Sequence, residues 1–270
     1  MLKKMMATAL AAGLALSLAA CGDSDDGGST GGDKIKIGIK FDQPGLGLKE
    51  SDGSFSGFDV DMAKYIAKGL GHKESDIQFV EAVSANRETF LQNGTVDMIL
   101  ATYSINDERK AKVDFAGPYY LAHQDLLIRS DDSSITGPDS LDGKKLCSVT
   151  GSTSAQRVKD DYADKVQLQE MDTYSKCVDA LLGGQIDALT TDDIILAGFA
   201  QQHPGELKVV GEGFSDENYG VGLPKGSKDR DKINDLIEKS FTDGAWKKAF
   251  EDNLGDSGYQ LPEPPKVDRY

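Results

Sequence analysis

Cationic and metal-ligating side chains are scarce in this sequence. Lys and Arg number 30 against 45 Asp and Glu, so the formal net charge is −15 at pH 7, and the 270 residues include 3 His and 1 Trp. Nucleic acids and anionic membrane surfaces bind proteins through cationic side chains, so this balance argues against nucleic acid as a partner. The histidines, His72, His123 and His203, are scattered without ligand spacing, which predicts no metal site.

Motifs of nucleotide and hydrolytic chemistry are absent as well. The sequence contains no G-x-x-x-x-G-K-[ST], no G-x-G-x-x-G after a strand-like segment, no G-x-S-x-G and no H-E-x-x-H. We therefore expect no cofactor. Two classes of function remain open at this point, an enzyme and a protein that binds a small molecule.

The amino-terminal residues have the layout of an export signal. Two lysines precede residues 5–20, which are uncharged and fewer than the roughly 18–20 residues of a membrane-spanning helix. The closing string Leu18-Ala19-Ala20-Cys21 resembles the lipobox of bacterial lipoproteins, which implies a signal peptide over residues 1–20 and lipid on Cys21. The alternative is a soluble secreted protein with a chance cysteine.

The next segment is rich in Gly, Ser and Asp. Residues 22–33 read GDSDDGGSTGGD, a composition that cannot pack a core and that predicts a flexible tether. We expect the lipidated Cys21 and this tether, residues 21–33, to hold the folded body at the extracytoplasmic face of the cell membrane. Stable anchoring needs more than one acyl chain, and bacterial lipoproteins carry several chains on this cysteine.

The two remaining cysteines form an even pair in an exported chain. Cys147 and Cys177 are expected to form a disulfide, because such bonds form and persist outside the cytoplasm. The alternative is two buried free thiols.

The body alternates strand-like and helix-like segments, which predicts an α/β protein with mostly parallel sheets. Strands are expected at 34–40, 77–80, 96–101, 125–129, 145–149, 166–169, 186–189 and 219–223. Helices are expected at 57–70, 84–92, 106–113, 152–163, 174–182, 192–201, 227–241 and 245–254, with a tail at 255–270. Two open sheets of this kind place a ligand at the carboxyl ends of their strands, in a cleft between them.

One string in the body is specific. Residues 57–62, Gly-Phe-Asp-Val-Asp-Met, followed by Ile66-Ala67 and Leu70, resemble the signature of family 3 extracellular solute-binding proteins, the polar amino-acid receptors of ABC importers. Without that resemblance, the string predicts only an amphipathic helix after a turn. The resemblance spans Lys34 to about Leu254 and looks closest to glutamate-binding lipoproteins.

The resemblance implies a periplasmic-binding-protein-like fold of type II, with two α/β lobes and a ligand cleft between them. Lobe 1 is expected at 34–121 plus 221–254, lobe 2 at 122–220, and crossover segments near 121–124 and 220–223.

The resemblance also assigns residues to the two charged groups that every amino acid carries. The α-carboxylate is expected to bind Thr102, Ser104, Arg109, Ser152 and Thr153, because a guanidinium and a helix amino terminus suit an anion. Asp192 is expected to bind the ammonium, with Asp193 as the alternative. Taken alone, Arg109 lies in a charged run that also fits a solvated helix face, and Ser152 fits a simple helix cap.

The remaining assignments concern the ligand side chain. The resemblance implies that Ser84 and Arg87 bind a distal carboxylate and that Lys40 adds a second cation, which points to L-glutamate or L-aspartate. Tyr174 is expected to reach the ligand as well. Without the resemblance, Lys40 fits an exposed strand end, Arg87 fits a surface helix residue, and Tyr174 fits a packing residue. One departure from the family lies at residues 42–44, Asp-Gln-Pro, where many members place an aromatic side chain. This departure argues against aliphatic and aromatic ligands.

We therefore expect a monomer that captures L-glutamate, or L-aspartate, by hinge closure and delivers it to the membrane permease of an ABC importer. The alternatives are a cleft enzyme similar to cyclohexadienyl dehydratases and a receptor for another polar amino acid such as glutamine. Glutamate and aspartate differ by one methylene, which is worth only about 1–3 kcal/mol, so the sequence does not separate them.

Overall fold

The computed structural model describes residues 34–162 and 164–270, all of which fall within one compact unit. The predicted signal peptide, Cys21 and the tether lie outside the described residues. Within the described part of the chain, no helix is long and apolar enough to cross a membrane.

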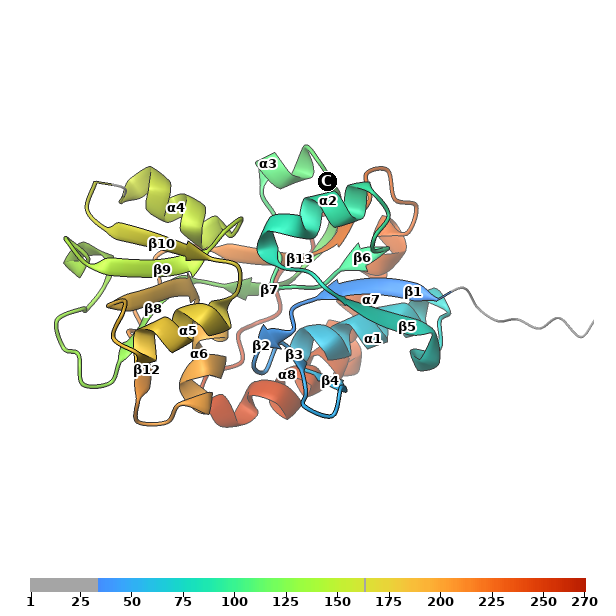
Figure 1. The fold of residues 1–270 in the computed structure, drawn as a ribbon. Coiled ribbons are helices and arrows are strands. Elements are labelled where there is room, and N and C mark those ends of the chain that lie inside the picture. The colour runs from blue at the N-terminus through green and yellow to red at the C-terminus, as the bar shows by residue number, and fades with distance from the viewer. Residues whose placement is uncertain (1–33, 163) are drawn as a thin grey trace, which may run out of the picture. The chain divides into compact units, whose positions relative to one another are not determined.

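Two five-stranded sheets organise the body (Figure 1). The first has the order β5-β1-β6-β13-β7, made of β1 (Ile35–Ile39), β5 (Ile77–Glu81), β6 (Met98–Ile99), β7 (Asp114–Ala122) and β13 (Glu217–Leu223). The second has the order β10-β9-β11-β8-β12, made of β8 (Gln124–Arg129), β9 (Lys145–Val149), β10 (Gln167–Met171), β11 (Ala188–Asp192) and β12 (Leu207–Val209). The two sheets therefore have a common strand order. In each, one strand (β1 or β9) lies between the next two strands of the chain that join its sheet (β5 and β6, or β10 and β11).

The sheets are mixed rather than mostly parallel. In the first, β5, β1 and β6 are parallel, whereas β13 runs antiparallel to β6 and β7. In the second, β10, β9 and β11 are parallel, whereas β8 runs antiparallel to β11 and β12. The expectation of mostly parallel sheets is therefore correct for three strands of each sheet and wrong where β7, β8 and β13 carry the chain between the sheets.

Helices pack along both sheets. They are α1 (Phe58–Leu70), α2 (Arg87–Gln92), α3 (Asp107–Lys110), α4 (Thr153–Asp161), α5 (Tyr174–Leu182), α6 (Asp193–Gln202), α7 (Arg230–Asp243) and α8 (Ala245–Leu254). A small antiparallel sheet joins β2 (Asp42–Gln43), β3 (Gly47–Lys49) and β4 (Phe55–Ser56). Short 3₁₀ turns lie at Glu74–Asp76, Ser84–Asn86, Pro138–Ser140 and Gly255–Ser257.

The signature string forms the start of α1. Phe58, Met62 and Ile66 recur at helical spacing and are fully buried, so one face of the helix packs into the core. The helix ends at Gly71, whose φ of 103° lies in the left-handed region that glycine adopts without steric cost. Phe58 packs against Trp246 of α8 with ring centroids 6.2 Å apart, which links the signature to the carboxyl-terminal helices.

Two parts of the fold differ from the expectation. The longest strand, β7, lies in a stretch for which no strand is predicted. Residues 84–86 form a 3₁₀ turn, so the helix expected at 84–92 begins at Arg87, and the hydroxyl of Ser84 accepts a hydrogen bond from Lys40.

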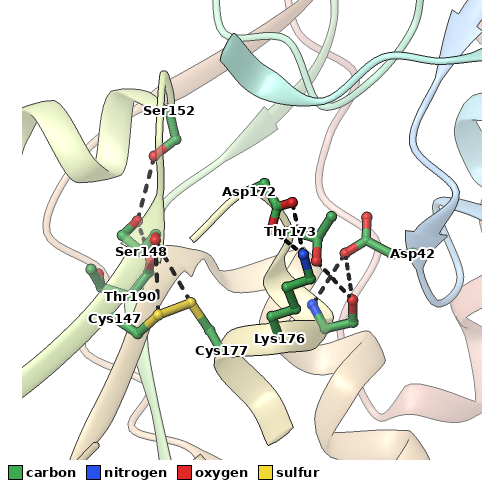
Figure 2. Close-up of a disulfide and its surroundings, with 10 residues drawn as sticks. Asp42, Cys147, Ser148, Ser152, Asp172, Thr173, Lys176, Cys177 and Thr190 are labelled. Carbon is green, nitrogen blue, oxygen red and sulfur yellow. Dashed lines mark hydrogen bonds and ion pairs between the residues drawn. A yellow bond between two sulfur atoms is a disulfide. The ribbon is translucent and has the colours of Figure 1, made fainter. Parts of the chain in front are cut away.

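The expected disulfide is present. Cys147 of β9 and Cys177 of α5 are bonded, with their Cα atoms 5.8 Å apart (Figure 2). Ser148 lies beside this bond, and its hydroxyl donates to the carbonyl of Thr190 on β11 at 2.9 Å. The disulfide therefore links strand β9 of the second sheet to helix α5, close to the neighbouring strand β11.

The carboxyl-terminal segment packs on the body. The hydroxyl of Tyr259 donates to Asp193 of α6 at 2.6 Å, and its ring lies 6.5 Å from that of Phe250 of α8. Farther on, the backbone N–H of Asp268 donates to the carbonyl of Gly117 at 2.8 Å. The segment expected as a tail thus contacts elements of both sheets.

Candidate functional site

Loops that follow the strands of both sheets meet at a cavity of about 510 Å³. Four of the predicted ligand residues line it, namely Ser84, Arg109, Ser152 and Thr153. The other six are buried beside it, namely Lys40, Arg87, Thr102, Ser104, Tyr174 and Asp192. Hydrogen bonds and close charges connect these six to one another and to the cavity walls. The structure thus brings all ten predicted residues together.

Lys40 follows β1 directly and is buried, not an exposed strand end. Its Nζ donates to the hydroxyl of Ser84 at 2.8 Å, so one of its three N–H donors is used among the described residues. Burial, followed by the charge of Arg87, lowers the pKa of Lys40 to about 7. An acceptor with negative charge would restore the ordinary pKa of this ammonium.

Arg87 is a buried and firmly held cation, not a surface residue. Its Nη1 donates to the carbonyls of Ala101 at 3.0 Å and Thr102 at 3.2 Å. Its Nε donates to the carbonyl of Ser84 at 3.3 Å, and its guanidinium lies 4.2 Å from the ring centroid of Tyr103. Burial, then the charge of a neighbouring arginine, lowers the pKa of Arg87 to about 10, so it stays charged at neutral pH.

Arg109 lies on α3, whose amino terminus is capped by the side chain of Asn106. Its Nη1 donates to the carbonyl of Ser104 at 2.7 Å, and its Nη2 donates across the cavity to the carbonyl of Gly151 at 3.0 Å. Its Nε forms an ion pair with Glu88 at 3.3 Å. Glu88 lies one helix turn beyond Ser84, and no sequence motif marks it as a site residue.

The amino terminus of α4 forms the opposite wall. Ser152 caps this helix by accepting a hydrogen bond from the backbone N–H three residues on, at 2.9 Å. The hydroxyl of Thr153 donates to Glu217 at 2.9 Å and lies 3.4 Å from the hydroxyl of Ser104. Glu217, which the sequence analysis also missed, is buried at the start of β13 and orients Thr153.

Asp192 ends β11 in a buried position. It accepts hydrogen bonds from the hydroxyl of Tyr219 at 2.5 Å and from that of Ser154 at 3.4 Å. Burial, followed by the charge of Glu217, raises the pKa of Asp192 well above its ordinary value. Burial and the charge of Asp192 raise the pKa of Tyr174 to about 12, so this phenol stays protonated. A cationic group placed here would favour the ionised form of Asp192.

Asp193 has a different set of partners. It accepts hydrogen bonds from the backbone N–H of His123 at 3.1 Å and from the hydroxyl of Tyr259 at 2.6 Å. Both partners belong to segments that connect the sheets rather than to the cavity wall. The geometry therefore favours Asp192 over Asp193 as a ligand contact.

Asp59 of the signature string has a structural role that its motif does not indicate. It is fully buried and accepts hydrogen bonds from the backbone N–H of Thr102 at 2.9 Å and from the hydroxyl of Tyr119 at 2.7 Å. Thr102 has a φ of 46°, a conformation that non-glycine residues adopt at a cost. Burial raises the pKa of Asp59 to about 6. The signature thus fixes the backbone of a site residue rather than contacting a ligand.

Comparison with known proteins identifies the class to which this fold and site belong. The model of bacterial extracellular solute-binding proteins, family 3, matches residues 35–256, so the chain belongs to this family. This confirms the resemblance and the type II periplasmic-binding-protein-like fold, and the family implies an extracytoplasmic location.

Individual relatives narrow the comparison. The glutamate-binding protein GluB of Corynebacterium glutamicum is 47% identical over 272 residues, which cover 95% of this chain and 91% of GluB. The ABC transporter glutamine-binding protein GlnH of Bacillus subtilis is 37% identical, over 92% of this chain and 96% of GlnH. The solved structure of an ancestral arginine-binding protein bound to glutamine has a TM-score of 0.76 and 35% identity, covering 82% of this chain and 98% of that one. These relatives are named as binding proteins, not as enzymes.

Proposed function

We propose that this protein is the receptor of an amino-acid ABC importer and that it binds an acidic amino acid, glutamate first, without turning it over. The observation that supports this most strongly is a group of three buried cations: Arg109 lines the cavity, and Lys40 and Arg87 donate hydrogen bonds to Ser84, which also lines it. Buried charges are retained when an opposite charge satisfies them. Among described residues, the ion pair of this group is that of Arg109 with Glu88, so a ligand with two carboxylates would supply the missing negative charge.

The two ends of the ligand would have separate partners. Arg109, Thr102, Ser104 and the amino terminus of α4 at Ser152 and Thr153 would bind the α-carboxylate. Asp192 would bind the ammonium, since its raised pKa marks a site that lacks a positive charge. Lys40, Ser84, Arg87 and Tyr174 would face the distal carboxylate. The names of GluB and GlnH agree with a ligand of this size and polarity.

Closure of two lobes over the ligand would make the binding selective. The lobes would be residues 34–121 plus 221–254 and residues 122–220, with crossovers near 121–124 and 220–223. Cross-sheet contacts such as that of Arg109 with the Gly151 carbonyl support a cavity whose walls come from both lobes. A ligand that contacts both walls stabilises the closed form, because only differential contacts shift such an equilibrium. The permease would then receive the closed form.

Two further parts of the proposal concern the oligomeric state of the protein and its attachment to the membrane. The protein would act as a monomer, attached at the outer face of the cell membrane through lipid on Cys21 after removal of residues 1–20. Mass spectrometry of the protein purified from bacterial membranes tests the anchor, because an acylated amino-terminal Cys21 has a characteristic added mass. An unmodified chain that begins upstream of Cys21 would contradict it.

Thermal unfolding against the common amino acids tests the ligand. Ligand at about 100 times its dissociation constant adds about 2.7 kcal/mol to the free energy of unfolding, which at this size raises the midpoint by several degrees. We expect this shift with glutamate, shared at most with aspartate, after any co-purified ligand has been removed by unfolding and refolding. A shift with glutamine or arginine alone would overturn the proposed specificity. Recovery of unchanged glutamate by NMR after overnight incubation would support binding without turnover.

A further inference from the structure

The amide of Gln43 is a buried polar group to which the proposed site gives no role. Gln43 ends β2 and is 0% exposed. Its Oε1 accepts a hydrogen bond from the hydroxyl of Thr102 at 3.3 Å. Its Nε2 has no acceptor among residues 34–162 and 164–270. Buried N–H groups without a partner are rare and costly in folded proteins, so this nitrogen points to a partner outside the chain.

Gln43 belongs to the same chain of hydrogen bonds as two of the buried cations. Thr102, which holds its amide oxygen, accepts Arg87 through its backbone carbonyl at 3.2 Å. Arg87 donates in turn to the carbonyl of Ser84 at 3.3 Å, and the hydroxyl of Ser84 accepts the Nζ of Lys40 at 2.8 Å. These four residues and Gln43 therefore form one connected group.

Contacts on both sides hold the segment of Gln43 between Lys40, which follows β1, and the helix α5. Gln43 pairs with Gly47 of β3, and a Cβ on Gly47 would lie 2.7 Å from the carbonyl oxygen of Lys40. The preceding residue, Asp42, accepts hydrogen bonds from the backbone N–H and the hydroxyl of Ser175 on α5, at 3.1 and 3.2 Å. Gln43 is thus held beside Lys40 on one side and the amino terminus of α5 on the other.

We infer that Gln43 is a specificity-determining residue, whose Nε2 donates to the distal carboxylate of an acidic amino acid alongside Lys40. This inference rests on the proposed function. The Lys40 ammonium and the Gln43 nitrogen present only N–H donors, which suit the two acceptor oxygens of a carboxylate. A glutamine ligand has the same shape but would place its own NH₂ group against these donors. Gln43 therefore favours glutamate over glutamine in two ways. Its N–H attracts the carboxylate of glutamate, and it opposes the NH₂ group of glutamine, which is also a donor.

Two substitutions with opposite chemistry test this role. Gln43→Leu removes the amide at similar volume, and Gln43→Glu replaces the donor with an acceptor. By calorimetric titration, we expect Gln43→Leu to weaken glutamate binding about tenfold and glutamine binding less than about threefold. We expect Gln43→Glu to weaken glutamate binding further, because the new carboxylate repels the distal carboxylate of glutamate. We expect the preference to reverse in favour of glutamine, because the same carboxylate accepts a hydrogen bond from the side-chain amide of glutamine.

Controls separate this role from a structural one. The unfolding midpoint of ligand-free Gln43→Leu should equal or exceed that of the wild type. The variant removes an unpartnered buried donor, and the Thr102 hydroxyl keeps the Ala101 carbonyl as its acceptor at 2.8 Å. Gln78→Leu, on the exposed face of β5, should change neither affinity. Equal losses for both ligands, or a larger loss for glutamine, would overturn the inference, and the second result would mean that the amide presents its oxygen. A wild-type protein that binds glutamine and not glutamate would instead overturn the proposed function.

Discussion

Asp59 shows how a single buried carboxylate can govern a site that it does not enter. It holds the backbone N–H of Thr102 and the hydroxyl of Tyr119 in a fully buried position. Removing it would leave two polar groups without partners, each of which costs about 1–3 kcal/mol when buried. The positive φ of Thr102 would also lose its support.

We predict that Asp59→Ala lowers the free energy of unfolding by about 3 kcal/mol and weakens ligand binding. Urea unfolding and calorimetric titration measure the two effects. Asp61→Ala is a matched control in the same string, because Asp61 is partly exposed and bonds to Asn253, away from the cavity. A loss at Asp59 no larger than that at Asp61 would contradict the role assigned to the buried carboxylate.

Lys40 and Asp192 should make ligand affinity depend on pH in opposite directions. Lys40 must be protonated to bind a carboxylate, and its pKa is lowered to about 7, so affinity falls as the pH rises above 7. Asp192 must be ionised to bind an ammonium, and its pKa is raised by burial and Glu217, so affinity falls as the pH decreases. Together they predict a maximum near neutral pH.

We expect glutamate to bind several-fold more weakly at pH 6 and at pH 8.5 than at the optimum between them, in calorimetric titrations at constant ionic strength. The variant Lys40→Met should bind more weakly but lose the alkaline decrease while keeping the acidic one. If its alkaline decrease persisted, Lys40 would not be the titrating group.

At the scale of elements, the disulfide joins two segments that each carry a site residue. Cys147 lies in β9, which leads to Ser152, and Cys177 lies in α5, which begins at Tyr174. The bond closes a loop with a sequence separation of 30 residues, worth roughly 3–4 kcal/mol in the chain-entropy account.

The double variant Cys147→Ala/Cys177→Ala should therefore lose about 3–4 kcal/mol in the free energy of unfolding. The wild type in reducing agent should show the same loss, and the double variant should not respond to reductant. Denatured, unreduced body protein that begins after Cys21 should show no reactive thiol. Two reactive thiols per chain would contradict the disulfide.

The sequence predicts elements well where the signal is local. The helix α5, the helix α8 and the strand β9 have the predicted bounds, because apolar spacing and glycine mark their ends. The strand β7 is not predicted, because its pairing with β13 joins residues about 100 positions apart. Non-local pairing of this kind leaves no trace in a window of neighbouring residues.

The same distinction applies to the site. Residue types and the family resemblance predicted ten side chains, of which four line the cavity and six are buried and joined to its wall by hydrogen bonds or close charges. They did not predict that the donors of Arg87 are directed to backbone carbonyls, or that Asp59 reaches a residue 43 positions away. Such contacts depend on how distant segments pack.

At the scale of the whole molecule, the carboxyl-terminal segment links the two sheets. Tyr259 bonds to Asp193 of α6, which packs on the second sheet, and its ring lies on Phe250 of α8, which packs against α1. Its position next to the crossover strands gives this one side chain contacts on both sides of the predicted hinge.

We predict that Tyr259→Phe lowers the free energy of unfolding by about 1.5–3 kcal/mol, the usual contribution of a hydrogen bond to a charged group. Tyr65→Phe is the matched control, because Tyr65 is also half-buried and donates to Asp243 at 2.7 Å, but this hydrogen bond is exposed to solvent. Thermal or urea unfolding of the two variants measures the difference. Equal losses would show that the bond to Asp193 contributes no more than a surface contact.

The buried pair of Asp59 and Thr102 also bears on how such a receptor diversifies. The Asp59 carboxylate holds the backbone of Thr102, whereas in the proposed site the ligand side chain would meet Lys40 and Gln43, which follow β1 in the chain. A substitution at position 40 or 43 therefore leaves the frame intact. Single substitutions at these positions can therefore change which amino acid is preferred. The signature string at residues 57–62 is constrained separately, because its side chains pack in the core.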